Sequence, residues 1–524
     1  MTAFEDLSLL RAFLSIVQAT VAGAAVVLAA SASAEPLHIL IVHADQHRID
    51  CLGAYGNKEI KTPHIDSLAA DGVRFNNSFC TFPVCTPSRY SLLSGLPVHE
   101  HHGWDNHCTL RPGTATFASV LRQAGYATKA VGKMHFAPTY LDVGFAEMEL
   151  AEQDGPGRWD DDYHRYLRQL GLVDANDLED QRSEYRRGGR QIYWDSFGAL
   201  PSNLQEKDYS TTWIADRAME TLQKWTPEQP ALLMVGFIKP HHPFDPPEPW
   251  AHRYEPEKIS LLPGWTPRMF PYDARGYFTN AALSEAAVRR CTALYYASIS
   301  EIDEQVGRML TLLKSKGLYQ NTLIIFTSDH GEYLGFHHQL LKSGQMYEPL
   351  AKVPLIVKLP GNRQAGSVSD KLVSNIDVAP TVLKIAGCKL PPEMKGLDLT
   401  DSTAVRDIVF CETADRVMAR TQTRKLLYNT RNPDRSLFFD LQHDPLEMTN
   451  ACAEPAFKKD VAVLIEAIQT WRPNRPGRAF LDENAPQIRQ PNVPANTQAN
   501  RQEMIDYFAR KMKEWRQKLG ASAF

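Results

Sequence analysis

Short apolar and β-branched runs recur along the chain, and several of them end in polar residues. They predict strands at 37–43, 73–79, 127–131, 231–237, 322–327 and 353–359. Runs of this length, bounded by turn residues, are typical of strands buried in a parallel sheet. Helical spacing of apolar residues predicts helices at 62–69, 116–124, 213–225, 285–316 and 375–386. The pattern predicts an α/β fold with a large, mostly parallel central sheet flanked by helices.

The pattern changes near residue 406. Four short strand-like segments separated by polar turns predict a small antiparallel sheet, at 408–411, 417–421, 425–429 and 436–441. A Pro- and Asn-rich stretch that we expect to wrap around the fold precedes an amphipathic basic helix at 504–519. We expect this helix to dock on its own domain rather than on a membrane or a partner, with oligomer contact as a further alternative.

These patterns divide the chain into three parts. Residues 1–34 form a predicted signal peptide, 35–400 an α/β domain, and 401–524 a smaller C-terminal α+β subdomain. The polar segment 140–208 predicts an insertion that covers a cleft of the α/β domain, although a solvated surface loop fits the same composition.

The N-terminus has the features of an export signal. A run of small and apolar residues, 12–30, follows Arg11, and Ala32-Ser33-Ala34 matches a small-x-small cleavage site. An uncleaved membrane anchor is the alternative, because the run approaches the length that spans a bilayer. The many alanines and the Ala-x-Ala end favour cleavage, so we expect a periplasmic or secreted protein.

Composition and charge give no indication of a nucleic-acid-binding or zinc-finger protein. The chain has 524 residues, 43% of them apolar, and a net charge of −4. A nearly neutral chain gives no indication of nucleic-acid binding, so an anionic substrate would have to be met by local charge. The eight cysteines are scattered, without a Cys-x-x-Cys zinc pattern.

One cysteine lies in an unusual setting. Cys85 stands between Pro83 and Pro87, and the following residues suit a helix with Ser88 as its N-cap. Cys85 would then sit in a turn beside a helix N-terminus, where backbone N–H groups and Arg89 favour an anion. A buried, inert cysteine is the plainer alternative. The local chemistry favours a reactive cysteine in an anion-binding turn.

Two predicted strands end in possible metal ligands. Asp45 and Gln46 follow the first strand, and Asp329 and His330 follow the strand at 322–327. Oxygen donors suit a hard divalent cation, and the imidazole nitrogen of His330 would also accept Mn²⁺. Either pair alone would be weak evidence for a metal site, because turns and helix caps use the same residue types. Together with Cys85 they predict a metal site.

The run Cys85-Thr86-Pro87-Ser88-Arg89, followed by Leu93-Ser94-Gly95, resembles the signature of type I sulfatases in the alkaline-phosphatase-like superfamily. The resemblance extends from about residue 37 to about residue 450. It implies that a formylglycine-generating enzyme converts Cys85 to formylglycine, whose hydrate is the nucleophile. It also implies one divalent metal, with Ca²⁺ expected and Mn²⁺ or Mg²⁺ as alternatives. The implied metal-binding residues are Asp45, Gln46, Cys85, Asp329 and His330.

Two positions indicate a branch of the family. Gln46 stands where related sulfatases usually carry a second aspartate, and His330 stands where better-known members carry asparagine. This combination resembles the branch that holds choline sulfatases and phosphonate monoester hydrolases. A histidine-rich segment at 99–107 fits no zinc spacing and is interpreted as a solvated loop lining a cleft. Within it, Asn106 matches a substrate-side asparagine of the same branch.

The resemblance also implies roles for the cationic residues. Lys133, in a Gly-Lys-x-His run, would bridge the formylglycine and the sulfate, and His135 would polarise the nucleophile. His241, in Pro-His-His-Pro-Phe, would protonate the leaving oxygen, with its neighbour His242 as the alternative. Lys342 would contact the sulfate, and Arg89 would stabilise its charge. His337 and His338 are further candidates for lining the cleft.

The predicted function is therefore hydrolysis of sulfate monoesters, of a sulfated glycan or of an aryl or alkyl alcohol. A phosphodiesterase or phosphonate monoester hydrolase acting through the same site is the nearest alternative. A catalytically inactive glycan-binding protein is the third. The expected partners are the sulfated substrate and the maturation enzyme, and the oligomeric state is left open.

Overall fold

The computed structural model describes residues 37–153, 157–273, 278, 283–342, 344–474, 479–488 and 498–520. The predicted signal peptide lies outside the described residues, as does much of the predicted wrapping tail. Over the described ranges, no helix has both the length and the apolar character needed to cross a bilayer.

The central sheet has eight strands in the order β4-β3-β5-β1-β6-β7-β2-β8. They are β1 His38–Ala44, β2 Val73–Phe79, β3 Ala127–Gly132, β4 Glu147–Leu150, β5 Ala231–Phe237, β6 Thr322–Ser328, β7 Leu355–Lys358 and β8 Ser367–Ser374. The strands from β4 to β6 are parallel, and β7 is antiparallel to both of its neighbours. The predicted mostly parallel sheet is confirmed. The sequence pattern missed β4 and β8, the two edge strands, because both carry charged side chains along their exposed sides.

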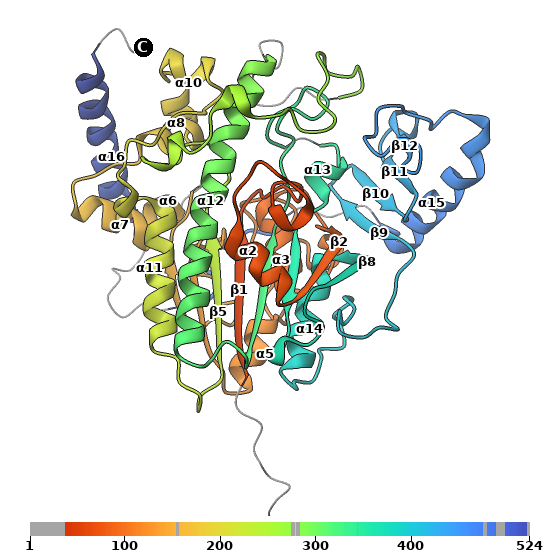
Figure 1. The fold of residues 1–524 in the computed structure, drawn as a ribbon, viewed down its shortest axis with the longest axis horizontal. Coiled ribbons are helices and arrows are strands. Elements are labelled where there is room, and N and C mark those ends of the chain that lie inside the picture. Colours follow the sequence, from red (N-terminus) through yellow and green to blue (C-terminus); the bar gives the residue numbers. More distant parts are fainter. Residues whose placement is uncertain are drawn as a thin grey trace, which may run out of the picture. The chain divides into compact units, whose positions relative to one another are not determined.

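Helices cover both faces of this sheet. On one face lie α2 Pro63–Ala70, α11 Ser210–Gln223 and α12 Glu285–Ser315, the last two side by side (Figure 1). On the other lie α3 Cys85–Ser94, α5 Phe117–Gln123 and α14 Val378–Ile385. The side chains of β1 alternate between the two layers, with Leu40 and Val42 facing α12 and Ile39 and Ile41 facing α3. Burial on both faces explains why β1 is apolar throughout.

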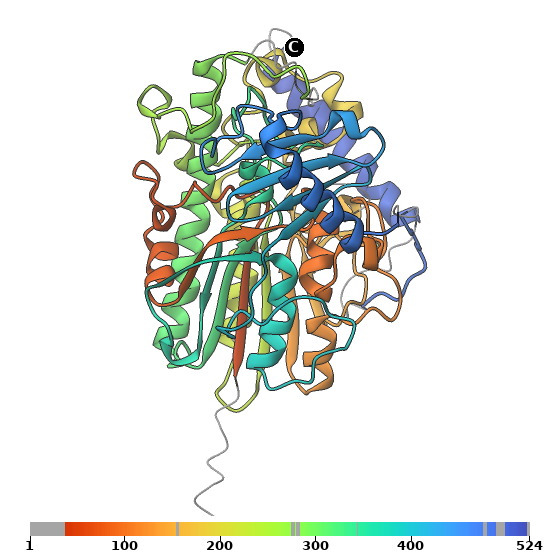
Figure 2. The ribbon, with the colours of Figure 1, turned by 90° about the vertical axis from the view of Figure 1, so that its right-hand side faces the viewer.

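The C-terminal part contains the predicted small antiparallel sheet. Its strands are β9 Val409–Glu412, β10 Arg416–Arg420, β11 Arg424–Asn429 and β12 Leu437–Asp440. One face, including Leu426, packs against Leu464 of the unpredicted helix α15 Lys458–Trp471, which crosses the sheet in Figure 2. The other face, including Leu427, packs against Tyr347 beside the short helix α13 Glu348–Ala351. The boundary at 400 stays a prediction.

The segment between β4 and α11 folds into short helices. They are α6 Gly157–Asp160, α7 Asp162–Gln169, α8 Ala175–Gln181, α9 Ser183–Arg186 and α10 Gln191–Asp195. The last helix, α16 Gln498–Leu519, lies against them (Figure 1) and buries Phe508 and Met512 beside Trp159 and Leu178. The predicted terminal helix is present and begins earlier than expected. Its apolar face is covered by its own chain, as the sequence analysis favoured.

Candidate active site

Four neighbouring parallel strands end at one edge of the sheet, and candidate residues follow each end. The strands β3, β5, β1 and β6 run in the same direction, so their carboxyl ends meet there. The residues that follow are Lys133 and His135 after β3, His241 after β5, Asp45 and Gln46 after β1, and Asp329 and His330 after β6. Such edges are where open α/β sheets bind ligands.

Two glycines allow β3 and β5 to close tightly beside this edge. Gly132 has a φ of +87°, and a Cβ there would lie 2.1 Å from the Gly236 carbonyl oxygen. A Cβ at Gly236 would lie equally close to the Lys133 carbonyl oxygen, at 2.1 Å. The Lys133 N–H donates to the Gly236 carbonyl at 2.7 Å. The glycine pair thereby fixes where the Lys133 side chain leaves the sheet.

Cys85 is the first residue of α3, which corrects the sequence analysis. The N-cap is Val84, four residues before the predicted N-cap Ser88, and its side chain makes no capping bond. Ser88 is inside the helix, and its hydroxyl donates to the Asp329 carbonyl at 2.6 Å. Pro87 misled the prediction, because a proline is tolerated within the first helical turn, where N–H groups lack intrahelical partners. The helix N-terminus is thus fastened directly to the end of β6.

Four buried side chains converge at this point. One ligand atom from each of Asp45, Cys85, Asp329 and His330 lies within 4.8 Å of the others. The Cys85 Sγ lies 3.7 Å from Asp45 Oδ1 and 3.4 Å from His330 Nε2. Three stretches that are far apart in the sequence therefore form one cluster.

The charge states of these groups suit a divalent cation. Burial and the neighbouring Lys342 lower the pKa of His330 to about 4, so its ring is neutral at pH 7. Its Nδ1 bonds the Gly331 carbonyl at 2.9 Å, which leaves the Nε2 lone pair facing the cluster. Burial alone would raise the pKa of Asp45, but Lys133 and other cationic neighbours hold it well below its usual range. Two carboxylates and one neutral imidazole fit a divalent ion.

Gln46 lies beside the cluster in a strained backbone conformation. Its φ is +62°, a left-handed value that is uncommon for residues other than glycine. Its main-chain N–H donates to Asp329 Oδ1 at 3.0 Å, and its side-chain amide donates to Glu332. Its Oε1 accepts from Lys342 Nζ at 3.3 Å. The role of Gln46 as a metal ligand stays a prediction.

Arg89 and Lys133 offset the two carboxylates. Arg89 donates to Asp329 Oδ2 and to Asp45 Oδ2, each at 2.9 Å, and its side chain is 1% exposed. Lys133 Nζ lies 2.7 Å from Asp45 Oδ2 and donates to Gln153 Oε1 at 3.2 Å. Arg89 therefore lies behind the carboxylates and orients them. The implied role of Arg89 in stabilising charge on the sulfate stays a prediction.

Lys342 and His241 contact each other, and Lys342 also contacts Cys85 and His330 of the cluster. Lys342 Nζ lies 3.4 Å from Cys85 Sγ, 3.3 Å from His330 Nε2 and 3.1 Å from His241 Nε2. His241 Nδ1 bonds the His242 carbonyl at 2.7 Å, so Nε2 is the nitrogen that points to the cluster. Burial and Lys342 lower the pKa of His241 well below its usual value.

The neighbouring histidine has different surroundings. His242 Nδ1 lies 2.6 Å from Asp180 Oδ1, and its Nε2 bonds the Phe197 carbonyl at 2.7 Å. The ring is thereby tied to the insertion, whereas His241 reaches Lys342. The choice of His241 over His242 as the acid stays a prediction.

His135 and Asn106 lie on the loops around Cys85. The His135 N–H donates to Glu152 at 2.9 Å, and Thr86 Oγ1 donates to the His135 carbonyl at 2.7 Å. The Thr86 N–H donates to Asn106 Oδ1 at 3.1 Å. Both predicted residues are thus held beside the start of α3.

Other histidines predicted near the cleft are not where we expected them. His101, in the segment interpreted as solvated, is buried and bonds Ser91 at 2.9 Å. His337 is packed on Phe336 and bonds the Leu446 carbonyl at 2.9 Å. His338 bonds the Thr266 carbonyl at 2.9 Å. Their clustering in sequence reflects packing rather than a shared site.

A cavity of about 370 Å³ opens beside the cluster. Six predicted residues line it, namely Gln46, Asn106, Lys133, His135, His241 and Lys342. Asp180, Gln181 and Arg186 of the insertion line it as well, together with His242 and Leu341. The predicted insertion therefore does reach the cleft. The sequence analysis assigned no role to these three residues, nor to Gln153 and Glu332, because their contacts depend on how distant segments pack.

Comparison with known proteins places this arrangement in a family. The family model described as "Sulfatase" matches residues 38–388, more than half of the chain. The chain belongs to the sulfatase family. A second model, "N-sulphoglucosamine sulphohydrolase, C-terminal", matches residues 336–474. Membership of the family makes this chain a sulfuric ester hydrolase, so the inactive glycan-binding alternative is not supported.

Individual relatives agree with this assignment. An arylsulfatase of Clostridium perfringens (strain 13 / Type A) is 30% identical over 459 residues, which cover 82% of this sulfatase and 92% of the relative. A choline-sulfatase of Rhizobium meliloti (strain 1021) is 27% identical, covering 82% and 84%. The solved phosphonate monoester hydrolase of Agrobacterium radiobacter superposes with a TM-score of 0.70 at 24% identity, covering 87% and 100%. The last likeness shows the alkaline-phosphatase-like fold.

Proposed function

We propose that this sulfatase hydrolyses sulfate monoesters through a formylglycine made from Cys85 and one divalent metal, with Ca²⁺ expected. The observation that carries the proposal is the meeting of Cys85 with Asp45, Asp329 and His330 inside one buried cluster. A nucleophile beside two ionised carboxylates and a neutral imidazole is the arrangement that metal-assisted ester hydrolysis requires.

The divalent metal and the formylglycine would supply two functions. Asp45, Asp329 and His330, with Gln46 beside them, would hold the metal, which would supply Lewis acidity to the reaction. A hydrated formylglycine at position 85 supplies the hydroxyl pair for covalent catalysis and subsequent release. The remaining chemistry falls to side chains of the chain itself.

Two ammonium groups stabilise charge on the transferring group. Lys133 and Lys342 both line the cavity, and Lys342 Nζ lies 3.4 Å from Cys85 Sγ. Fixed cations in a site shielded from water stabilise the charge that builds up in the transition state. Arg89 contributes by orienting the carboxylates of Asp45 and Asp329.

His241 protonates the leaving oxygen, and His135 accepts a proton when sulfate is released. Because Nδ1 of His241 faces the His242 carbonyl, Nε2 is the nitrogen that exchanges a proton with the substrate. Its pKa is low beside Lys342, and an anionic ester bound between them raises it. His135 lines the same cavity.

The first experiment compares substrate classes. The protein is produced with a formylglycine-generating enzyme, and peptide mass spectrometry verifies conversion of Cys85. Initial rates are then measured on 4-nitrophenyl sulfate, on an aryl phosphodiester and on an aryl phosphonate monoester. We expect the highest kcat/KM on the sulfate. A higher value on the phosphorus esters would favour the alternative, which Gln46 and His330 keep open.

A second experiment tests the role of His241. For His241→Gln we expect kcat/KM on an alkyl sulfate to fall about 10²- to 10⁴-fold, because an alkoxide leaves poorly without a proton. The loss on 4-nitrophenyl sulfate should be much smaller, because nitrophenolate needs little protonation. Equal losses on the two substrates would remove His241 from the acid role.

We further propose that the protein is exported and cleaved after Ala34. The support is the sequence of residues 12–34. N-terminal sequencing of the protein from cell fractions tests it, and a mature chain that keeps residues 1–34 would contradict it.

A further inference from the structure

Glu332 is a buried carboxylate beside the four-residue cluster of the candidate active site, and it accepts three hydrogen bonds. Its side chain is fully buried, and its Oε2 accepts from the side-chain amide of Gln46. Its Oε1 accepts from the main-chain N–H of Leu334 at 2.9 Å and from that of Leu341. Because all three partners are N–H donors, both oxygens of Glu332 act as acceptors.

The three residues that donate to Glu332 share a left-handed backbone conformation. The φ angle is +62° at Gln46, +43° at Leu334 and +64° at Leu341. This conformation is uncommon for residues other than glycine, and it persists where surrounding contacts stabilise it. Glu332 therefore contacts three strained residues, one of which directly precedes Lys342.

The backbone of Gln46 is fixed by groups other than Glu332. Its main-chain N–H donates to Asp329 Oδ1 at 3.0 Å, and its carbonyl accepts from the Tyr295 hydroxyl at 2.6 Å. Glu332 contacts the side-chain amide instead. A change at Glu332 should therefore alter the orientation of this amide more than the position of the residue.

The Glu332 carboxylate determines which end of the Gln46 amide faces the cluster. An amide carries an NH₂ donor on one side and an oxygen acceptor on the other, and their hydrogen-bond partners tell the two apart. Because the NH₂ group faces Glu332, the oxygen is turned the other way, where it accepts from Lys342 Nζ at 3.3 Å. The same Nζ lies 3.4 Å from Cys85 Sγ and 3.3 Å from His330 Nε2, so the Gln46 oxygen is on the cluster side.

Glu332 also accounts for an amide rather than a carboxylate at position 46. A carboxylate there would face the carboxylate of Glu332, and two like charges in contact disfavour ionisation of the pair. The amide of Gln46 donates to Glu332 and still presents an oxygen on its other side.

We propose that Glu332 is a positioning residue, which keeps the side-chain oxygen of Gln46, rather than its NH₂ group, turned to the site that holds the divalent metal. The inference rests on the proposed function, in which Gln46 stands beside the other metal-binding residues. Divalent cations such as Ca²⁺ bind amide oxygens, whereas the NH₂ group offers them no lone pair. Groups that orient a metal ligand from behind contribute about 10- to 100-fold to metal affinity.

The substitution Glu332→Gln isolates this role. The new amide oxygen can still accept from the N–H groups of Leu334 and Leu341, so the new NH₂ group faces Gln46. Two NH₂ groups cannot hydrogen-bond each other, so the Gln46 amide turns over and presents its own NH₂ group to the cluster. Adding Gln46→Glu exchanges donor and acceptor across the pair, which restores an oxygen on the cluster side.

The measured quantity is the dissociation constant for Ca²⁺, with Mn²⁺ and Mg²⁺ titrated in parallel. The formylglycine-containing protein is freed of metal with a chelator, its fold is checked by circular dichroism, and each ion is titrated in competition with a chromophoric chelator. For Glu332→Gln we expect Kd to rise about 10- to 100-fold. The exchange variant Gln46→Glu/Glu332→Gln should bind at least as tightly as the wild type.

Glu301→Gln is the matched control, because it removes the charge of another fully buried glutamate, on α12. It should keep the wild-type Kd. If Glu332→Gln does not fold, Gln46→Glu is compared with the exchange variant instead. The exchange variant should then bind Ca²⁺ at least about tenfold more tightly, because Gln46→Glu alone sets two carboxylates against each other.

Three results would overturn the inference. The first is an unchanged Kd in Glu332→Gln. The second is a loss of affinity that the exchange variant does not recover, which would make Glu332 a support for the loop of Lys342 only. The third is an equal loss in Glu301→Gln, which would reflect a general effect of removing a buried charge.

The proposed function and this inference fail in different ways. A wild type that binds Ca²⁺ but hydrolyses no sulfate ester would remove the proposed function, and the affinities of the variants would still decide the role of Glu332. A wild type that binds none of the three ions would overturn the inference.

Discussion

The two walls of the cavity are built in different ways. On the sheet side, Asp45, Cys85 and Asp329 are at most 1% exposed, and they follow strand ends or begin a helix fixed to one. On the insertion side, Arg186 is partly exposed and comes from a helix of four residues, α9. The first wall gains its position from the main sheet, and the second gains it from contacts with α16.

Groups that take part in the reaction and groups that recognise the rest of a substrate have different structural requirements. Groups that must hold a nucleophile and an ion at fixed distances need the rigid, water-shielded edge of a sheet. Groups that recognise the rest of a substrate can lie on loops and short helices, which tolerate change. The two walls should therefore respond differently to substitution.

Cys85→Ala should have the largest effect. We expect kcat to fall at least about 10⁴-fold, because the nucleophile is removed while the charged groups remain. The metal content, measured by mass spectrometry of the purified protein, should stay close to that of the wild type, since Asp45, Asp329 and His330 are untouched. Activity near the wild-type level would refute the assignment of Cys85.

Asp45→Asn should reduce both activity and stability. Asp45 is the shared partner of Arg89 at 2.9 Å and Lys133 at 2.7 Å, so the substitution leaves buried cations without their counter-charge. We expect the free energy of unfolding to drop by about 3–5 kcal/mol, measured by urea denaturation. The exposed Asp407→Asn is the control and should change stability little. A similar drop in both variants would contradict the buried charge network.

Glu152→Gln should change the pH dependence of stability. Burial raises the pKa of Glu152 to about 7 in the folded protein, from an ordinary value of 4.5. The folded state then binds more protons than the unfolded state between these two values, so stability falls as pH rises through that window. Glu152 contributes at most about 3 kcal/mol to this decrease in the free energy of unfolding.

Urea denaturation between pH 4.5 and 7.5 checks this expectation. The decline should be shallower in Glu152→Gln than in the wild type. Glu147→Gln, at a side chain that is 70% exposed, is the control and should follow the wild-type profile. Parallel profiles for the wild type and Glu152→Gln would show that Glu152 does not titrate in this range.

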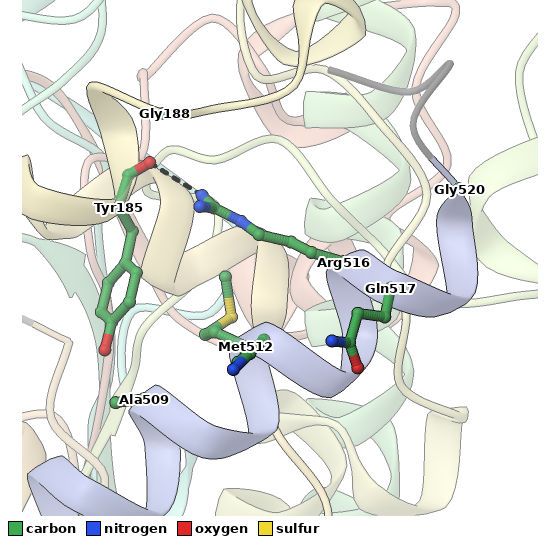
Figure 3. A pocket seen from close by; sticks show the side chains of 8 residues that line it. Tyr185, Gly188, Ala509, Met512, Arg516, Gln517 and Gly520 are labelled. Atoms are coloured by element: carbon green, nitrogen blue, oxygen red, sulfur yellow. Dashed lines mark hydrogen bonds between the residues drawn. The ribbon is translucent and has the colours of Figure 1, made fainter.

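Arg516→Met should have the smallest effect and should act on the insertion wall. Arg516 of α16 donates to the Tyr185 carbonyl at 3.0 Å (Figure 3), and loss of this hydrogen bond loosens the segment that carries Arg186. We expect KM for 4-nitrophenyl sulfate to rise about three- to tenfold with little change in kcat, as for one ordinary hydrogen bond. Lys518→Met, on the exposed side of the same helix, is the control. A fall in kcat with KM unchanged would couple α16 to the chemistry instead.

The sequence alone determined the sheet side to a large extent. The strands β1, β5 and β6 were readable because burial on both faces makes each of them apolar throughout, and their ends are marked by polar residues. Parallel strands bring their carboxyl ends together, so Asp45 and Asp329 could be expected to meet. The start of α3 was placed wrongly, because a proline in the first turn looks the same in sequence as one before the helix.

Only the tertiary structure decided the other wall. Arg182, Arg186, Arg187 and Arg190 are indistinguishable by composition, and their surroundings depend on Glu179, Glu184 and a helix more than 300 positions later in the chain. The same holds for Arg89, whose two carboxylate partners were not evident from its motif. The periodicity of apolar residues indicates which face of a helix or strand is buried, because apolar side chains gather on the face that is shielded from water. It does not report which charges meet, because that depends on how distant segments pack.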